Sequence, residues 1–141
     1  MADPHNLDRF LTAQDENYET ALEELRAGRK RSHWIWFIFP QLAGLGSSPT
    51  AQHYAIKSLE EAQAYLAHPI LGGRLHESLK ALQLLEPTSA EAVFGSLDAM
   101  KFRSSLTLFA EAGGDPIVEA ALDRWFDGRR DEKTLELLRR A

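Results

Sequence analysis

The chain has 141 residues, of which 44% are hydrophobic and 26% charged, so we take residues 1–141 as a single globular domain and exclude a disordered chain. Its formal net charge is −5, with 16 lysines and arginines against 21 aspartates and glutamates. This balance argues against a protein that binds nucleic acid through its phosphates, because such proteins carry a basic surplus.

The N-terminal part of the chain has the pattern of one long helix. Apolar side chains recur at helical spacing over residues 6–27. Gly28 then provides the left-handed residue with which many helices end. We therefore expect a helix over residues 6–27.

The middle of the chain predicts two consecutive helices. Ser58 and Glu61 have the spacing of a capping box, in which the hydroxyl accepts from a backbone N–H and the glutamate reaches back to the helix start. This helix should end near His68. Pro69 fits the first position of the next helix, where the missing N–H of proline costs nothing. The stripe expected to face the core consists of Leu71, Leu75, Leu79 and Leu82.

Four more helices are expected toward the C-terminus. Thr88 and Glu91 repeat the capping-box spacing, and Ser96 is expected to cap the helix that follows. Pro116 should begin another helix, and Asp131 should cap the last. Together these signals predict an all-α fold, a compact multihelical bundle of about seven to eight helices. The residues expected to face its core are Phe102, Leu106, Phe109, Val118, Ala121, Leu122, Trp125, Leu135 and Leu138.

The apolar run over residues 34–39, WIWFIF, suits a buried strand as well as a buried helical turn. A strand needs a partner for its backbone groups, and no other segment has the composition of a strand. We therefore expect a helical turn that is buried on all sides and ended by Pro40. In particular, Trp36, Phe37 and Phe39 should be largely buried.

Residues 40–49 form a loop that contains two glycines and two serines, among them Ser47. Its backbone N–H groups could bind an anion ahead of a helix start, or the segment could be a plain connecting loop. Tyr54 and Lys57, three residues apart, would share a face if they lie on one helix. They could then meet a bound anion or ring, or be a core-edge tyrosine and a solvated lysine.

A second polar stripe is expected in the helix that follows Ser96. Lys101, Ser104, Ser105 and Leu108 have the spacing of one helix face, beside the apolar stripe of the same helix. Small hydroxyl side chains at such a position permit a close helix contact, and they can equally line a polar pocket. Both interpretations stay open.

Several kinds of site have no support in the sequence. There is no cysteine, the five histidines lack paired metal spacing, and no nucleophile motif is present, so we expect neither a metal nor a cofactor. His33, beside two tryptophans, could be a perturbed acid or base or a hydrogen-bonded structural residue. Residues 1–10 lack the pattern of a signal peptide, and no apolar run could span a membrane. We expect a cytoplasmic protein.

The segments SHWIWFIFPQLAGLGSSPTAQHYAIKSLEEAQAYLAHPILGGRL and DAMKFRSSLTLF closely resemble the bacterial domain-of-unknown-function family DUF eighteen-ten. The resemblance implies a compact multihelical fold and no established activity. Some members carry the label calpastatin, which does not suit a chain that builds a core.

Gln52, Tyr54 and Lys57 also resemble a cluster of a glutamate, an aromatic residue and a lysine in the NADAR family, which is linked to NAD and ADP-ribose. Gln52 stands in place of the glutamate, and an amide does not supply the general acid or base that a carboxylate would.

Two functions follow as hypotheses. The first is binding of a small anionic ligand, of nucleotide or ADP-ribose type, in a polar-lined cleft, with a hydrolase as its most specific form. The second is a protein-interaction module without catalytic activity, which would be marked by an exposed apolar patch. The residues expected to converge on the cleft are Trp34, Trp36, Gln41, Ser47, Tyr54, Lys57, Lys101 and Ser105.

Overall fold

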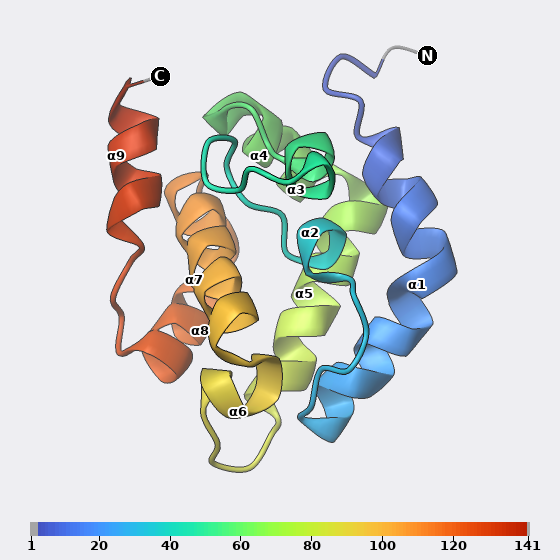
Figure 1. Ribbon diagram of the computed structural model, residues 1–141, viewed down its shortest axis with the longest axis vertical. Helices are drawn as coiled ribbons and strands as arrows, with labels where there is room; N and C mark the ends of the chain where they lie inside the picture. Colours follow the sequence, from blue (N-terminus) through green and yellow to red (C-terminus); the bar gives the residue numbers. More distant parts are fainter. Residues whose placement is uncertain (1–2, 141) are drawn as a thin grey trace.

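The computed structural model describes residues 3–140, and over this range the chain forms nine helices and no β-strand (Figure 1). The prediction of an all-α multihelical bundle is confirmed, and six of the nine helices are nine residues or longer. The helices are α1 (Asp8–Ala27), α2 (Ile35–Ile38), α3 (Pro49–Tyr54), α4 (Leu59–Ala67), α5 (Pro69–Gln83), α6 (Ala90–Phe94), α7 (Ser96–Glu111), α8 (Pro116–Phe126) and α9 (Glu132–Arg140).

Helices α5 and α7 form the centre of the bundle. α5 packs against α1, α4 and α8, and α7 packs against α2, α4, α6, α8 and α9 (Figure 1). The leucine stripe of α5 and the phenylalanines of α7 are buried, as the sequence predicts. None of the helices in the described range is long and apolar enough to cross a membrane.

The apolar run forms helix α2, a single turn that packs against α1, α3 and α7. Its neighbours Trp34 and Phe39 are buried together with Ile35, Phe37 and Ile38. Trp36 is the exception, because it is only partly buried. The prediction of burial on all sides is therefore wrong for Trp36, since one side of this short turn remains open to solvent.

Two helix starts differ in detail from the prediction. Ser89, not Thr88, caps α6, because its Oγ accepts a hydrogen bond from the backbone N–H of Ala92 at 3.1 Å. Ser96 is the first residue of α7, and the preceding Gly95 occupies the cap position with a φ of +81°. A serine inside the helix cannot cap it, so α7 begins without a side-chain cap.

Helix α9 begins at the expected residue, but the residues that it buries differ from those predicted. Asp131 Oδ2 accepts from the backbone N–H of Thr134 at 3.0 Å, so Asp131 is the expected cap. Thr134 is the buried residue of α9, and Leu137 and Leu138 pack against the core from partly buried positions. Leu135, which was expected to face inward, is only partly buried.

Candidate functional site

Two adjoining surface hollows meet at Trp36 and Tyr54, and we call them together the aromatic hollow. The larger one is open, has a volume of about 440 Å³ and lies between α2 and α3. The smaller one, about 10 Å³, has room for no more than a water molecule. The larger part is lined by His33, Trp36, Phe37, Pro49, Thr50, His53 and Tyr54. The smaller part is lined by Trp36, Gln41, Leu42, Gly46, Ala51, Tyr54 and Ala55.

The local sequence explains how α3 presents Tyr54. Ser48 Oγ accepts from the backbone N–H of Ala51 at 3.1 Å, and Pro49 occupies the first helical position, so the helix starts sharply. The helix ends at Tyr54. The ring of Tyr54 then packs against Phe37, with the ring centroids 5.3 Å apart, and stays partly exposed.

The chain after α3 pairs with the loop after α2 by two backbone hydrogen bonds. The N–H of Ile56 donates to the carbonyl of Gln41 at 2.8 Å, and the N–H of Ala43 donates to the carbonyl of Ile56 at 2.7 Å. Ile56 itself is fully buried. This pairing fixes the smaller part of the aromatic hollow, because both of its sides are joined through Ile56.

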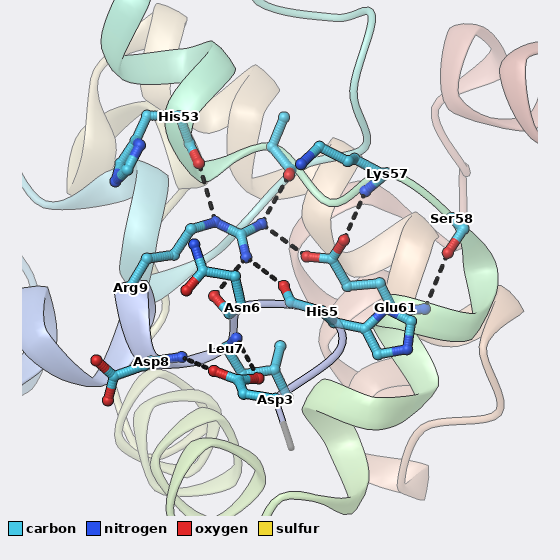
Figure 2. Close-up of polar contacts among 11 residues, drawn as sticks. Asp3, His5, Asn6, Leu7, Asp8, Arg9, His53, Lys57, Ser58 and Glu61 are labelled. Atoms are coloured by element: carbon cyan, nitrogen blue, oxygen red, sulfur yellow. Dashed lines mark hydrogen bonds and ion pairs between the residues drawn. The ribbon is translucent and has the colours of Figure 1, made fainter. Parts of the chain in front are cut away.

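A buried ion pair of Arg9 and Glu61 lies next to the end of α3 (Figure 2). Arg9 Nη2 and Glu61 Oε2 are 2.6 Å apart, and the two side chains are 5% and 3% exposed. Arg9 also donates to the carbonyls of His53 and Ala55, each at 2.9 Å. Both charges are therefore paired and hydrogen-bonded, which is the condition under which a buried charge is tolerated.

Glu61 departs from the expected capping box. Its backbone N–H donates to Ser58 Oγ at 3.1 Å, as predicted. Its Oε1, however, accepts from the backbone N–H of Lys57 at 3.1 Å (Figure 2). The carboxylate thus reaches one residue farther back than in a capping box, because its other oxygen is bound to Arg9.

Lysine side chains lie over both tryptophans of the α2 region. The Nζ of Lys101 is 5.3 Å from the ring centroid of Trp36, and the Nζ of Lys30 is 5.0 Å from that of Trp34. Asp98 bridges the two lysines, at 2.7 Å from Lys30 and 3.5 Å from Lys101. Lys30 is the buried and tightly paired member. The cluster therefore holds two ammonium groups and the Asp98 carboxylate, and the carboxylate of Glu24 lies close by, at 2.9 Å from Trp34 Nε1.

Glu24 anchors the chain that leads into α2. Partial burial alone would raise the pKa of its carboxyl group. Hydrogen bonds from Ser32 Oγ, the backbone N–H groups of Arg31 and Ser32, and Trp34 Nε1 outweigh this effect and lower the pKa to about 2. Glu24 is therefore a charged acceptor that positions Trp34.

The structure brings together part of the predicted cleft. Trp36, Gln41 and Tyr54 line the aromatic hollow. Lys101 is next to the hollow, because its ammonium group lies over the ring of Trp36. Trp34 does not line the hollow, since it is 1% exposed and packs in the core.

Three other predicted residues lie outside the hollow. Ser47 is exposed, and its backbone carbonyl accepts from Gln52 Nε2 at 2.9 Å. Lys57 is exposed and follows α3, so it does not share a helix face with Tyr54. Ser105 is buried, and its Oγ has no hydrogen-bond partner in the described part of the chain.

Two further lining residues, His33 and His53, are exposed. The sequence pointed to His33, because this residue lies beside two tryptophans. Nothing in the sequence singled out His53 except its position next to Tyr54, with which it makes an edge-on ring contact at a centroid distance of 4.6 Å. Between residues 3 and 140, no group of three histidine, aspartate or glutamate side chains is placed to hold a metal ion.

Comparison with known proteins gives a family and a fold. The family described as "Protein of unknown function (DUF1810)" matches residues 4–138. The crystal structure of the conserved hypothetical protein Rv1873 from Mycobacterium tuberculosis is similar to this chain, with 51% sequence identity and a TM-score of 0.95. The similarity covers 97% of this chain and 99% of that one. No curated protein matches the chain.

Proposed function

The chain belongs to the DUF1810 family of proteins of unknown function, and we propose that it binds a small anionic ligand with a planar ring in the aromatic hollow. The observation that carries this proposal is the pairing of a partly exposed tryptophan with a cation. Trp36 lines the hollow, and the ammonium group of Lys101 lies over its ring. A ring stacked in the hollow would thus have a positive charge close by.

The composition of the hollow fits such a ligand. Trp36, Phe37 and Tyr54 supply apolar and aromatic wall, and Thr50 and the two histidines supply a few polar groups. Small-molecule sites have this mixture, and an open volume of about 440 Å³ lies within their usual range. Aromatic rings stack on one another with a gain beyond the burial of their area.

The ligand class that we propose is a nucleotide or an ADP-ribose-type molecule. Its base would stack in the hollow, and its phosphate groups would meet Lys101. The faint likeness of residues 52–57 to the NADAR family points to the same class.

The most specific form of the proposal is a hydrolase that acts on an ADP-ribosyl bond, with water adding across the bond. Such a step needs a general acid or base. His33 and His53 are the lining residues with a side chain suited to this work. Binding and hydrolysis are therefore separate claims, and a product assay with a His53→Asn variant tests the second.

A thermal-shift titration with AMP, ADP and ADP-ribose tests binding. A ligand at 100 times its Kd stabilises the folded state by about 2.7 kcal/mol, so the melting temperature should rise with ligand concentration. Lys101→Met should remove most of this rise. Lys80→Met is the matched control, because Lys80 is an exposed lysine on α5 that does not line the hollow. If no nucleotide raises the melting temperature of the wild-type protein, the ligand class is wrong.

A protein-interaction module is the second candidate, and one observation favours it. Leu97 and Met100 lie one turn apart on α7 and are 73% and 67% exposed. Met100 borders a groove of about 390 Å³ that Trp125 and Phe126 also line. Exposed apolar side chains beside a groove are typical of a protein contact. Recovery of a bound protein by the wild type and not by Met100→Glu would support this function.

A further inference from the structure

We infer that Arg9 is a positioning residue of the aromatic hollow, one that holds the backbone on both sides of Tyr54. This inference rests on the proposed binding function for its significance. Its structural basis is the guanidinium group of Arg9, which comes from α1 and reaches the chain between α3 and α4 (Figure 2).

Every N–H group of the guanidinium has an acceptor. Nε donates to the carbonyl of His53, and Nη2 donates to the carbonyl of Ala55 and to Glu61. Nη1 donates to the carbonyls of His5 and Asn6, each at 2.7 Å. An arginine has five such donors in a rigid planar fork, and all five are used. The orientation of the group is therefore fixed.

Two of these acceptors are the carbonyls of His53 and Ala55, the residues before and after Tyr54. Arg9 thus fixes the peptide group between His53 and Tyr54 at the end of α3, and the peptide group between Ala55 and Ile56, where the chain has left the helix. Glu61 extends the same restraint by accepting from the N–H of Lys57. Residues 53–57 are held at both ends by one buried ion pair.

The next residue of α1 also touches Tyr54. The ring of Phe10 is fully buried, and its centroid lies 6.0 Å from that of Tyr54. The Cζ of Arg9 lies 4.3 Å from the centroid of the Phe10 ring. The backbone and the ring of Tyr54 are thus both supported from the start of α1.

Stability alone does not explain why Arg9 and Glu61 form a buried ion pair. Removing two charges from water costs free energy that their attraction often fails to recover, and an apolar pair of similar size can stabilise a fold as well. What an apolar pair cannot do is bind two backbone carbonyls and a backbone N–H. Arg9 and Glu61 do so at Tyr54, a residue that lines the hollow.

The test compares Arg9→Lys with Arg124→Lys. A lysine keeps the charge, but its compact ammonium group cannot reproduce the planar fork. Arg124 is a matched control, because its guanidinium donates to the carbonyls of Leu82, Gln83 and Leu85 at the end of α5. It performs the same kind of backbone restraint away from the hollow.

The first measurement is hydrogen exchange without ligand. The amide of Ile56, which bonds to the carbonyl of Gln41, should exchange about tenfold faster in Arg9→Lys than in Arg124→Lys, relative to the amides of α7 in each variant. Equal exchange of this amide in both variants would overturn the inference, whether or not a ligand is known.

The second measurement is the affinity for ADP-ribose, followed by the change in intrinsic tryptophan fluorescence, to which the partly exposed Trp36 contributes. Arg9→Lys should weaken binding about tenfold, and Arg124→Lys should leave it unchanged even if it lowers the melting temperature equally. Unchanged binding in Arg9→Lys would also overturn the inference. If the wild-type protein binds no nucleotide, the proposed function fails, and the exchange of Ile56 still decides whether Arg9 positions the backbone at Tyr54.

Discussion

Replacing Glu24 with glutamine should make the protein less stable at neutral pH, and the difference should shrink in acid. The carboxylate of Glu24 accepts four hydrogen bonds, from Ser32, Arg31 and Trp34, and its pKa is about 2 against an ordinary value of 4.5. A glutamine keeps the shape, but it has no charge and turns one acceptor into a donor that faces other donors.

The size of the effect follows from linkage. A depression from 4.5 to about 2 corresponds to roughly 3 kcal/mol as an upper bound, and solvent screening of a partly exposed group reduces it to about 1–2 kcal/mol. Because the pKa is lowered in the folded state, the stabilisation is complete above the unfolded value of 4.5 and is lost as the pH falls toward 2. At about pH 3, more than half of it should be gone.

Urea unfolding of the wild type and of Glu24→Gln, at pH 7 and at about pH 3, measures this difference. Glu23→Gln is the control, because Glu23 is an exposed neighbour on the same helix. It should have little effect at either pH. A gap between wild type and Glu24→Gln that keeps its full size in acid would refute the reasoning, since the charge would then not be its cause.

Four further substitutions have definite expected outcomes in the same unfolding assay. Phe39→Ala should cost about 3–5 kcal/mol, because Phe39 is fully buried and its ring lies 4.8 Å from that of Phe102. Gly72→Ala should cost about 1–3 kcal/mol, since its new Cβ would lie 2.3 Å from the backbone oxygen of Leu66, whereas Gly73→Ala meets no atom within 4 Å and should be neutral or stabilising. Ser105→Ala should be neutral or stabilising, because it removes a buried hydroxyl that has no partner in the described residues.

The helices could be predicted from the sequence because their causes are local. The leucines of α5 recur at helical spacing, Pro69 begins that helix, and Ser58 caps the one before it. Even the apolar run over residues 34–39 could be assigned to a helical turn, since no strand partner existed for it. What failed locally was the choice between adjacent cap residues, as at Thr88 and Ser89, where either hydroxyl has nearly the same spacing.

The candidate site could be predicted only in part, because its residues meet through tertiary contacts. Trp36, Gln41 and Tyr54 lie within one segment, and their convergence could be anticipated. Arg9 could not be found, since its partners His53, Ala55 and Glu61 follow it by 44 to 52 residues and two of them contribute only backbone. The position of Lys57 was predicted from helical spacing, and α3 ends before it.

The net charge of the chain and the charge at the hollow point to different ligands. A formal charge of −5 disfavours a long polyanion, which must meet many positive groups along an extended surface. A small anion needs only one or two cations at short range. Lys30 is tightly paired with Asp98, whereas Lys101, beside Trp36, lies farther from that carboxylate and is more exposed. Asp98 therefore holds Lys101 loosely enough for an incoming anion to compete, and the composition of the chain does not show this difference between the two lysines.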